Sequence, residues 1–334
     1  LERILTENSR WSTFVDAIDF ANCEILNDHE FILAYYEPFG PGLAYLATRY
    51  SSVLCKSYVE SSSTDAFWDK PVSSGPYVLK ENAAGSHSVY ELRDDYWGET
   101  PEAKTVTVRN YSEATTMFID YENGVLDAAF SVDSSDAARL VNGDVSDTHY
   151  AIAPGYDVYG LALPEYVEYF DDIKVRQAIA YAIDAPAVAE IGLGVLGGEA
   201  TSVLPSGVRY KIDAGTYEYN PEMAKQLLTE AGYNSGDISL RFVVVNFPSN
   251  VRMAEAIQAY LSAVGINVTV ESYDLATAVP IFMACETDLV INSMGATALE
   301  PDQQLDTVKA SSTNGSVRIT VPEVDNWLMT GRNS

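Results

Sequence analysis

Apolar side chains recur with the period of an α-helix at several places along the chain. One such pattern runs from Ala114 to Tyr121, with Ser112 placed as its N-cap and Gly124 where a left-handed residue ends a helix. A second helix is predicted from about Lys174, and a third directly after Asn220, whose side chain is suited to capping. The chain therefore contains amphipathic helices that bury one face against a core.

Shorter runs of alternating or continuous apolar residues predict β-strands. Two of them flank the polar turn 27–29, which indicates a hairpin. Further strands are predicted at 77–79, 88–93, 105–109 and 125–130. The first half of the chain is thus a mixture of hairpins and helices, as in α+β proteins.

The second half alternates between strand and helix patterns. Strands at 240–245, 266–270 and 288–292 are separated by helices at 253–264 and about 275–284. This βαβαβ order predicts a parallel sheet with right-handed crossovers. The continuous valine run in the first of these strands predicts a strand that is covered on both faces.

Composition and charge exclude some classes of partner. Apolar residues make up 47% of the 334 residues, which is enough for a core, and roughly two domains are expected from the length. The formal net charge is −28, so nucleic acid and anionic membrane surfaces, which bind through lysine and arginine, are not expected partners. No uncharged apolar run reaches the roughly 18 residues of a membrane span.

Groups that carry cofactor or metal chemistry are sparse. The three histidines lie far apart, and Cys23, Cys55 and Cys285 form no CxxC pair. The cysteines are expected to be small buried side chains, with one disulfide bridge as the alternative. The one GxGxxG match, at 192–197, follows a helix instead of a strand, so it predicts a helix end and no nucleotide site. We therefore expect neither a cofactor nor a metal ion.

Candidate catalytic residues are equally few. The neighbouring carboxylates at 94–95 and 171–172 are expected to be solvated turn residues, although paired carboxylates can also act as an acid–base pair. Aromatic residues are plentiful by contrast, and tyrosine suits a ligand cleft because it combines an apolar ring with a polar tip. The tyrosines that gather between 155 and 170, where the two halves meet, are Tyr156, Tyr159, Tyr166 and Tyr169. A change of domain there would place them near a cleft between lobes, and core positions are the alternative.

Five motifs resemble those of family 5 extracellular solute-binding proteins, the oligopeptide-, dipeptide- and nickel-binding components of ABC importers. The motifs are PVSSGPY at 71–77, RDDYW at 93–97, YENGVLD at 121–127, FDDIKVRQAI at 170–179 and YNPEMAKQLLTEAGY at 219–233. They occur in the order of the family, and the resemblance covers about residues 15–330.

The resemblance implies an α/β fold like that of the periplasmic binding proteins, type II and cluster C-like, with two lobes, mixed sheets and an incomplete first lobe. Residues 1–60 are then a remnant of the extra N-terminal lobe, 61–160 the first, mixed α+β lobe, and 161–334 the second, α/β lobe. Because family members are longer, we expect a chain that is truncated at both ends, without the C-terminal return to the first lobe.

The function that the resemblance implies is solute capture for import. A monomeric protein outside the cytoplasm, periplasmic or lipid-anchored at the outer face of the membrane, would deliver a peptide or similar mid-sized polar solute to the permease subunits of an ABC importer by hinge closure. We expect no enzymatic activity. Two alternatives stay open: a surface receptor or signalling protein of the same fold without transport, and a hydrolase that uses paired carboxylates.

Ligands of α/β sheets bind at the carboxyl ends of strands, and the lobe junction adds two tyrosines. The predicted ligand-binding residues are Tyr156, Tyr159, Asn246, Phe247, Met294, Gly295 and Thr297. In the peptide-binding members an aspartate pairs with the α-ammonium group of the peptide, and alignment places Thr297 at that position. Threonine cannot neutralise an ammonium group. The resemblance therefore does not imply that this loop recognises a free peptide N-terminus. Glu300 and Asp302 are the alternative carboxylates nearby.

Overall fold

The structure is a computed structural model. It describes residues 1–6, 12–62, 69–153, 155–295, 298–306, 308–309 and 320–333. The described chain divides into two compact units, one of Leu1 with residues 51–147 and one that joins residues 2–50 to 148–334. The lobe boundaries predicted near residues 60 and 160 stay a prediction, because they rest on the family resemblance.

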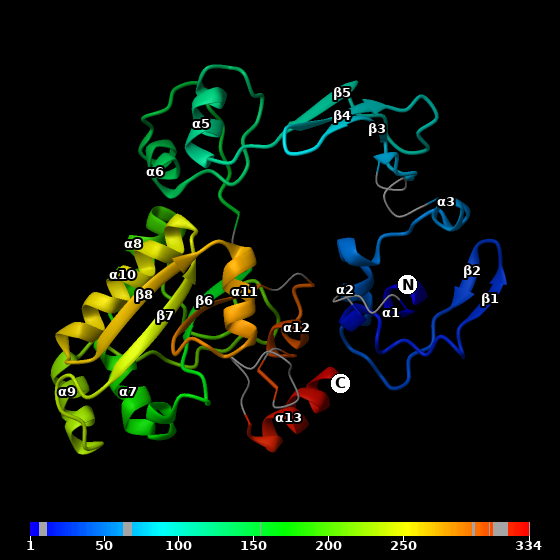
Figure 1. The fold of residues 1–334 in the computed structure, drawn as a ribbon. Coiled ribbons are helices and arrows are strands. Elements are labelled where there is room, and N and C mark those ends of the chain that lie inside the picture. The colour runs from blue at the N-terminus through cyan, green and yellow to red at the C-terminus, as the bar shows by residue number, and fades with distance from the viewer. Residues whose placement is uncertain are drawn as a thin grey trace. The chain divides into compact units, whose positions relative to one another are not determined.

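The unit of residues 51–147 combines an antiparallel sheet with short helices (Figure 1). Its elements are α3 (Lys56–Ser61), β3 (Tyr77–Ala83), β4 (His87–Leu92), β5 (Thr105–Arg109), α5 (Ala114–Glu122) and α6 (Ser134–Asn142). The strands pair in the order β3-β4-β5, each antiparallel to its neighbour. The strands predicted at 77–79, 88–93 and 105–109 are therefore confirmed.

Two of the segments that carry the family resemblance bind each other in this unit. The Arg93 guanidinium donates through Nη1 to the carbonyl oxygen of Ser73 at 2.8 Å. The Trp97 indole donates to the carbonyl oxygen of Ser74 at 3.0 Å. The two motifs thus form one hydrogen-bonded pair of loops beside the ends of β3 and β4.

Residues 125–130, predicted as a strand, form no strand in the structure. Gly124 follows α5 with a φ of +70°, as predicted, but the chain beyond it pairs with no strand among the described residues. Phe130 is 81% exposed, so the apolar run does not reach a core. A strand needs a neighbour for its backbone groups, and an apolar run alone does not supply one.

Two single-residue predictions are also wrong. Ser112 does not cap α5, because the N-cap position is Glu113, from which no side-chain hydrogen bond reaches the helix. Cys55 is exposed and not buried, because it lies at the N-cap position of the short helix α3, which has no buried residue. Cys23 and Cys285 are half-buried, and all three thiols are free.

The second unit combines an N-terminal segment with the alternating half of the chain. The elements of the N-terminal segment are α1 (Glu2–Thr6), η1 (Ser12–Phe14), β1 (Glu24–Asn27), β2 (Glu30–Ile32), α2 (Gly42–Leu46) and η2 (Arg49–Ser51). The later elements are β6 (Asp157–Ala162), η3 (Glu168–Asp171), α7 (Ile173–Ala182), α8 (Ala185–Leu193), η4 (Gly194–Leu196), α9 (Pro221–Glu230), β7 (Ser239–Val245), α10 (Pro248–Ala263), β8 (Asn267–Tyr273), α11 (Leu275–Met283), β9 (Val290–Gly295), α12 (Pro301–Asp306) and α13 (Pro322–Arg332). Strands β1 and β2 pair antiparallel, which confirms the predicted hairpin.

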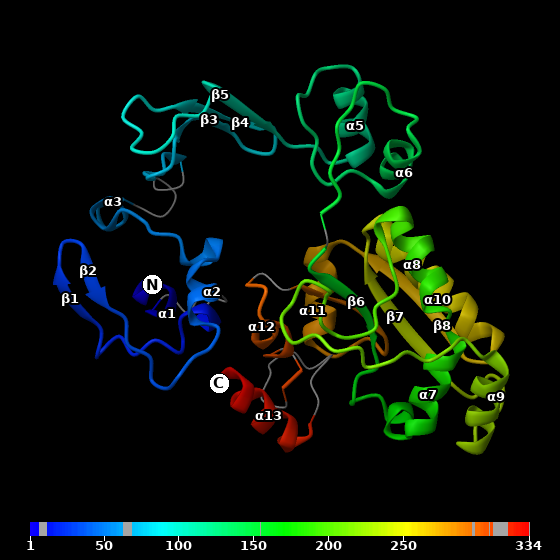
Figure 2. The same cartoon turned by 180° about the vertical axis from the view of Figure 1, so that it is seen from behind.

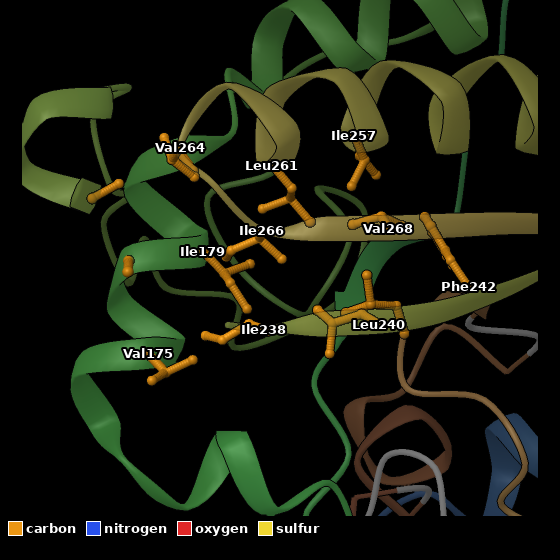
Figure 3. Close-up of a cluster of buried hydrophobic side chains, with 14 of the residues drawn as sticks. Val175, Ile179, Ile238, Leu240, Phe242, Ile257, Leu261, Val264, Ile266 and Val268 are labelled. Atoms are coloured by element: carbon orange, nitrogen blue, oxygen red, sulfur yellow. The ribbon is translucent and has the colours of Figure 1, made fainter. Parts of the chain in front are cut away.

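The core of this unit lies between the strands β7 and β8 and the helices α7, α9 and α10 (Figure 3). Strands β7 and β8 are parallel over their whole length, as predicted. Helix α10 lies along them with α8 beside it (Figure 2). Phe242 and Val243 point to opposite faces of β7 and are both 0% exposed, which confirms that this strand is covered on both sides.

Strand β9 has neighbours of both orientations. Leu289, just before it, forms a parallel bridge with Phe242 of β7, while β9 itself pairs antiparallel with β6. The βαβαβ pattern is therefore correct for the order of elements, and β6 adds an antiparallel strand that the pattern did not predict. The sheets are mixed, as the resemblance implied.

The N-terminal segment packs against the C-terminal helices of the same unit. Tyr45 of α2 is buried in a cluster that includes Ala298, and its hydroxyl donates to the Asp302 carboxylate in α12. Arg332 Nη2 in α13 lies 2.8 Å from Asp16 Oδ1. Segments about 300 residues apart in sequence are thus joined in one unit.

Candidate functional site in the alternating half

A cavity of about 530 Å³ lies within the alternating half of the chain. Small-molecule sites typically measure about 300–1,000 Å³. The wall comes from β6, from α8 and the turn η4 after it, from the segment 197–206 and from α10. All of these elements belong to one compact unit, so the cavity does not depend on how the two units are placed.

One wall of the cavity is apolar and comes from two helices that approach each other closely. Helix α8 begins after Asp184, whose carboxylate accepts from the Ala187 amide at 3.1 Å. It meets α10 at Gly192, where a β-carbon would overlap the Met253 side chain. Val188 of α8 and Met253 of α10 both line the cavity. The missing side chain at Gly192 permits this approach, and the two helices present a surface for aliphatic or aromatic groups.

The polar part of the lining includes two carboxylates and one lysine. Lys211 Nζ donates to Asp213 Oδ1 at 2.8 Å and to Thr201 Oγ1 at 3.1 Å, so its charge is already compensated. The hydrogen bond from Lys211, and then that from Thr201, hold the pKa of Asp213 below its usual value. Asp157 and Glu199 form no hydrogen bond or ion pair with any residue that the structure describes. The lining therefore carries uncompensated negative charge.

The β6–β9 ladder positions Asp157. This residue pairs with Gly295 in antiparallel register, and a β-carbon at position 295 would overlap Asp157 Oδ1. The Asp157 carboxylate thus lies over the backbone of Gly295, in space that a larger residue would fill. Tyr159 follows two positions later on the same face of β6 and also lines the cavity.

The predicted ligand-binding residues differ in how close they lie to this cavity. Tyr159 lines it directly, whereas Gly295 is not part of the lining and lies beside Asp157, which is. The Tyr156 ring packs over Gly207, just beyond the lining segment. Contact of these residues with a ligand stays a prediction.

The other predicted residues lie away from the cavity or outside the described part. Asn246 donates its backbone amide to the Tyr273 carbonyl at 2.8 Å. Phe247 is the N-cap residue of α10, 54% exposed and not part of the lining. Met294 lies in β9 with a side chain that is not described, and Thr297 lies outside the described residues. Their part in ligand binding stays a prediction.

Two tyrosines of the predicted cluster have structural contacts. The Tyr166 hydroxyl donates to the Thr287 carbonyl at 2.6 Å, and burial raises the pKa of Tyr166 to about 12. The Tyr169 ring meets the Tyr233 ring edge-on, with 5.7 Å between centroids. The cluster is thus divided between packing contacts and the cavity region.

The sequence patterns did not predict most of the cavity wall, because ligand sites were expected at strand ends. The glycine-rich match at 192–197 is a helix end, as predicted: α8 ends at Leu193 and Gly194 has a φ of +55°. The length of the connection that follows this helix end is a sequence feature that indicates a binding loop. The connection 197–220 between η4 and α9 exceeds the roughly 12–15 residues of an ordinary loop, and loops of that length are often binding loops.

One carboxylate of each neighbouring pair noted in the sequence has a structural partner. Asp95 forms an ion pair with Arg93 at 2.9 Å, and Asp172 caps α7 by accepting from the Lys174 amide at 2.8 Å. Over the described ranges, no group of three or more His, Cys, Asp or Glu side chains is arranged to hold a metal ion. In the same part of the chain no single helix is long and apolar enough to cross a membrane, and only the bent pair of α7 with α8 and η4 meets that test of length and composition.

Comparison with known proteins places the chain in a family. Residues 1–316 match the model described as bacterial extracellular solute-binding proteins, family 5, middle part. The chain belongs to this family. All five motifs that carried the resemblance lie within the matched range.

Curated relatives in this family include two with named ligands. The dipeptide-binding protein of Escherichia coli is 30% identical over 257 residues, which are 74% of this chain and 47% of that protein. The heme-binding protein A of Haemophilus influenzae is 29% identical over 233 residues, 68% of this chain and 42% of that protein. The chain thus spans about half the length of the curated relatives it matches.

Solved structures of similar fold include two from other bacteria. The ABC transporter-associated periplasmic binding protein DppA of Helicobacter pylori, in complex with the peptide STSA, gives a TM-score of 0.80 at 23% identity over 97% of this chain and 64% of that one. NikA of Brucella suis, in complex with Fe(III)-EDTA, gives 0.81 at 22% identity over 100% and 70%. The fold is that of the type II periplasmic binding proteins.

Proposed function

We propose that the chain binds a peptide or similar mid-sized polar solute outside the cytoplasm and delivers it to the permease subunits of an ABC importer. Its family is one of extracellular solute-binding proteins. Relatives in that family include a dipeptide-binding protein and a putative ABC transporter peptide-binding protein of Brucella ovis. The chain acts as a monomer and by binding alone, without making or breaking a covalent bond.

The cavity of about 530 Å³ carries this proposal. Its apolar wall from α8 and α10 suits a side chain, and its polar lining from β6 and the segment 197–206 suits charged or hydrogen-bonding groups. A peptide combines both kinds of group along a short chain. Delivery requires a change of shape, for which we propose hinge closure, with the ligand stabilising a closed state already present in the equilibrium.

The ligand panel that tests the proposal must be broad, because proteins of this fold have been solved with chemically different ligands. They include the dipeptide Met-Leu, agropinic acid and Fe(III)-EDTA. A panel of dipeptides, tetrapeptides, opines, sugars and metal chelates covers these classes.

The test is a thermal-shift measurement of the 334-residue chain with each member of the panel. A ligand present at 100 times its dissociation constant adds about 2.7 kcal/mol to the stability of the state that binds it. We expect at least one peptide to raise the melting temperature by several degrees and sugars to leave it unchanged. The proposal fails if no peptide or comparable polar solute shifts the transition.

A further inference from the structure

The long connection between η4 and α9 contains a loop, residues 201–214, whose two ends lie side by side. The Ala214 amide donates to the carbonyl oxygen of Thr201 at 2.9 Å, and the Thr201 hydroxyl donates to Asp213 Oδ1 at 2.5 Å. Lys211 Nζ donates to Thr201 Oγ1 at 3.1 Å and to Asp213 Oδ1 at 2.8 Å. Compact surface loops of about 6–16 residues with adjacent ends are Ω-loops, which frequently carry function.

This Ω-loop is joined to the rest of its unit by side chains and not by the backbone. In the described part of the chain, the hydrogen bonds of residues 201–214 all join two members of the loop. An ion pair from Arg209 to Glu300, just before α12, spans 3.9 Å, and the Arg209 side chain is 73% exposed. The Ω-loop can therefore move outward as one body without breaking a backbone hydrogen bond to the rest of the unit.

Apolar contacts seat the Ω-loop beside the cavity. Leu204 and Val208 are buried in a cluster with Leu305 of α12, and Leu204 also lines the cavity. The Tyr156 ring packs over Gly207, where a β-carbon would overlap it. The Ω-loop is thus a cavity wall whose attachment depends on contacts between side chains.

Lys211 joins the two ends of this wall. Among the described residues that line the cavity it is the only lysine or arginine, and its ammonium group is directed to Thr201 and Asp213. Because the ends are already joined, ordering the loop over a solute costs less conformational entropy than ordering a loop with free ends. Lys211 therefore gives the wall its shape before a solute arrives.

We infer that Lys211 is a positioning residue for solute binding and that the Ω-loop is a flap over the cavity. The flap, fastened at its ends by Lys211 with Thr201 and Asp213, moves out to admit the solute and returns over it. The rate at which the solute leaves then depends on this fastening. This inference rests on the proposed function and names the part of the same site that controls release.

The first test is stopped-flow fluorescence of the full chain with methionyl-leucine, a dipeptide found with a protein of this fold. Asp213 is exposed and lies outside the lining, so Asp213→Ala unfastens the flap without removing a contact to the solute. We expect dissociation at least tenfold faster in this variant, with the association rate changed less than threefold. Asp237→Ala is the matched control, because this exposed carboxylate also accepts two hydrogen bonds, both from Asn234, and it should leave both rates unchanged.

A double variant tests whether the fastening acts as one device. Lys211→Met should speed dissociation as Asp213→Ala does, and the two changes together should have no larger effect than either alone, because residues that act as a unit are not additive. Additive effects would show that Lys211 contacts the solute independently of Asp213 and would overturn its positioning role.

Chymotrypsin tests the fastening without solute. Tyr210 of the Ω-loop is 82% exposed, and cleavage after it, followed by mass spectrometry, reports opening of the loop. We expect Asp213→Ala to speed this cut at least fivefold and Asp237→Ala to leave it unchanged. Methionyl-leucine should slow the cut in the wild-type chain.

The outcomes separate this inference from the proposed function. Unchanged dissociation in Asp213→Ala, or a change confined to association through the freed Lys211 charge, would overturn the positioning role and leave solute binding intact. A Tyr210 cut that bound methionyl-leucine does not slow would overturn the flap. Failure of methionyl-leucine to bind would contradict dipeptide binding and control of its release, while the cut in the solute-free chain would still decide the fastening.

Discussion

The Thr287 side chain is 1% exposed. It links β7 to the segment just before β9, where the two backbones share only an isolated bridge. Its hydroxyl accepts from the Val243 amide at 3.0 Å and donates to the Leu289 carbonyl at 2.8 Å. Valine has the same shape but would leave the buried Val243 amide without a partner, at a cost of about 1–3 kcal/mol. Thr287→Val should lower the free energy of unfolding by that amount in a urea titration.

The matched control at this residue is Thr287→Ser, which keeps the hydroxyl and removes one methyl group. The lost apolar burial should cost about 1 kcal/mol, and the hydrogen bond to the Val243 amide should persist. If Thr287→Val left the free energy of unfolding unchanged, the hydroxyl would not be what holds β7 to the segment before β9.

At the scale of elements, β7 and β8 are joined by a side-chain ion pair as well as by their backbone hydrogen bonds. Arg241 donates to both carboxylate oxygens of Glu271, at 3.1 and 2.7 Å, and the Tyr273 hydroxyl donates at 2.9 Å. The hydrogen bond from Arg241, and then that from Tyr273, hold the pKa of Glu271 below its usual value of 4.5. The folded state thus favours ionised Glu271, which adds stability above pH 4.5 that is lost as the pH falls through the lower folded-state pKa.

Glu271→Gln should therefore lower the free energy of unfolding by about 1 kcal/mol at pH 7, the upper range for such partly exposed pairs. The difference from the wild-type chain should shrink as the pH falls below 4.5. Urea titrations between pH 7 and pH 3 measure it, with Glu255→Gln on the exposed side of α10 as the matched control. A difference that stays constant down to pH 3 would contradict the ion-pair account.

Elements with a clear local pattern were predictable from the sequence, and the pairing of strands was not. Asn220 accepts from the Met223 amide at 3.0 Å, and α9 begins at Pro221, as the capping pattern indicated. The run 125–130 has strand composition but no neighbouring strand among the described residues. Strand β6 was not predicted because Gly160 interrupts its short apolar run and weakens the strand pattern.

The residues of the candidate site also divide into those with a signal in the local sequence and those whose position depends on the fold. Tyr159, which lines the cavity, was among the predicted residues because tyrosines cluster at the junction, and its contact with a ligand stays a prediction. Asp157 could not be predicted, because its place depends on its register opposite Gly295 across the β6–β9 ladder. The cavity wall from the segment 197–206 has no periodic pattern, so only the length of that connection pointed to it.

At the scale of the whole molecule, the net charge of −28 governs how stability depends on salt. Like charges repel in the folded chain more than in the expanded one, and salt screens this repulsion, with a Debye length that falls from about 10 Å at 0.1 M to about 3 Å at 1 M. The melting temperature should therefore rise with sodium chloride, most steeply below about 0.5 M. Circular dichroism melts over 0.05–2 M measure it, and a flat or falling curve at low salt would contradict the prediction.

The central claim is that the cavity of the alternating half holds the solute, and a side chain placed inside it tests this claim most directly. Gly198 lines the cavity, and a β-carbon there meets no described atom within 4 Å, so a side chain can be attached at this position without a clash at its first atom. Gly331 in α13 has the same open surroundings but lies outside the lining, which makes it the matched control position.

The measurement is calorimetric titration of the most strongly stabilising solute from the panel into the wild-type chain, Gly198→Trp and Gly331→Trp. The account predicts that Gly198→Trp melts like the wild-type chain and loses at least tenfold in affinity, while Gly331→Trp binds as the wild-type chain does. Wild-type affinity in a folded Gly198→Trp chain would contradict it.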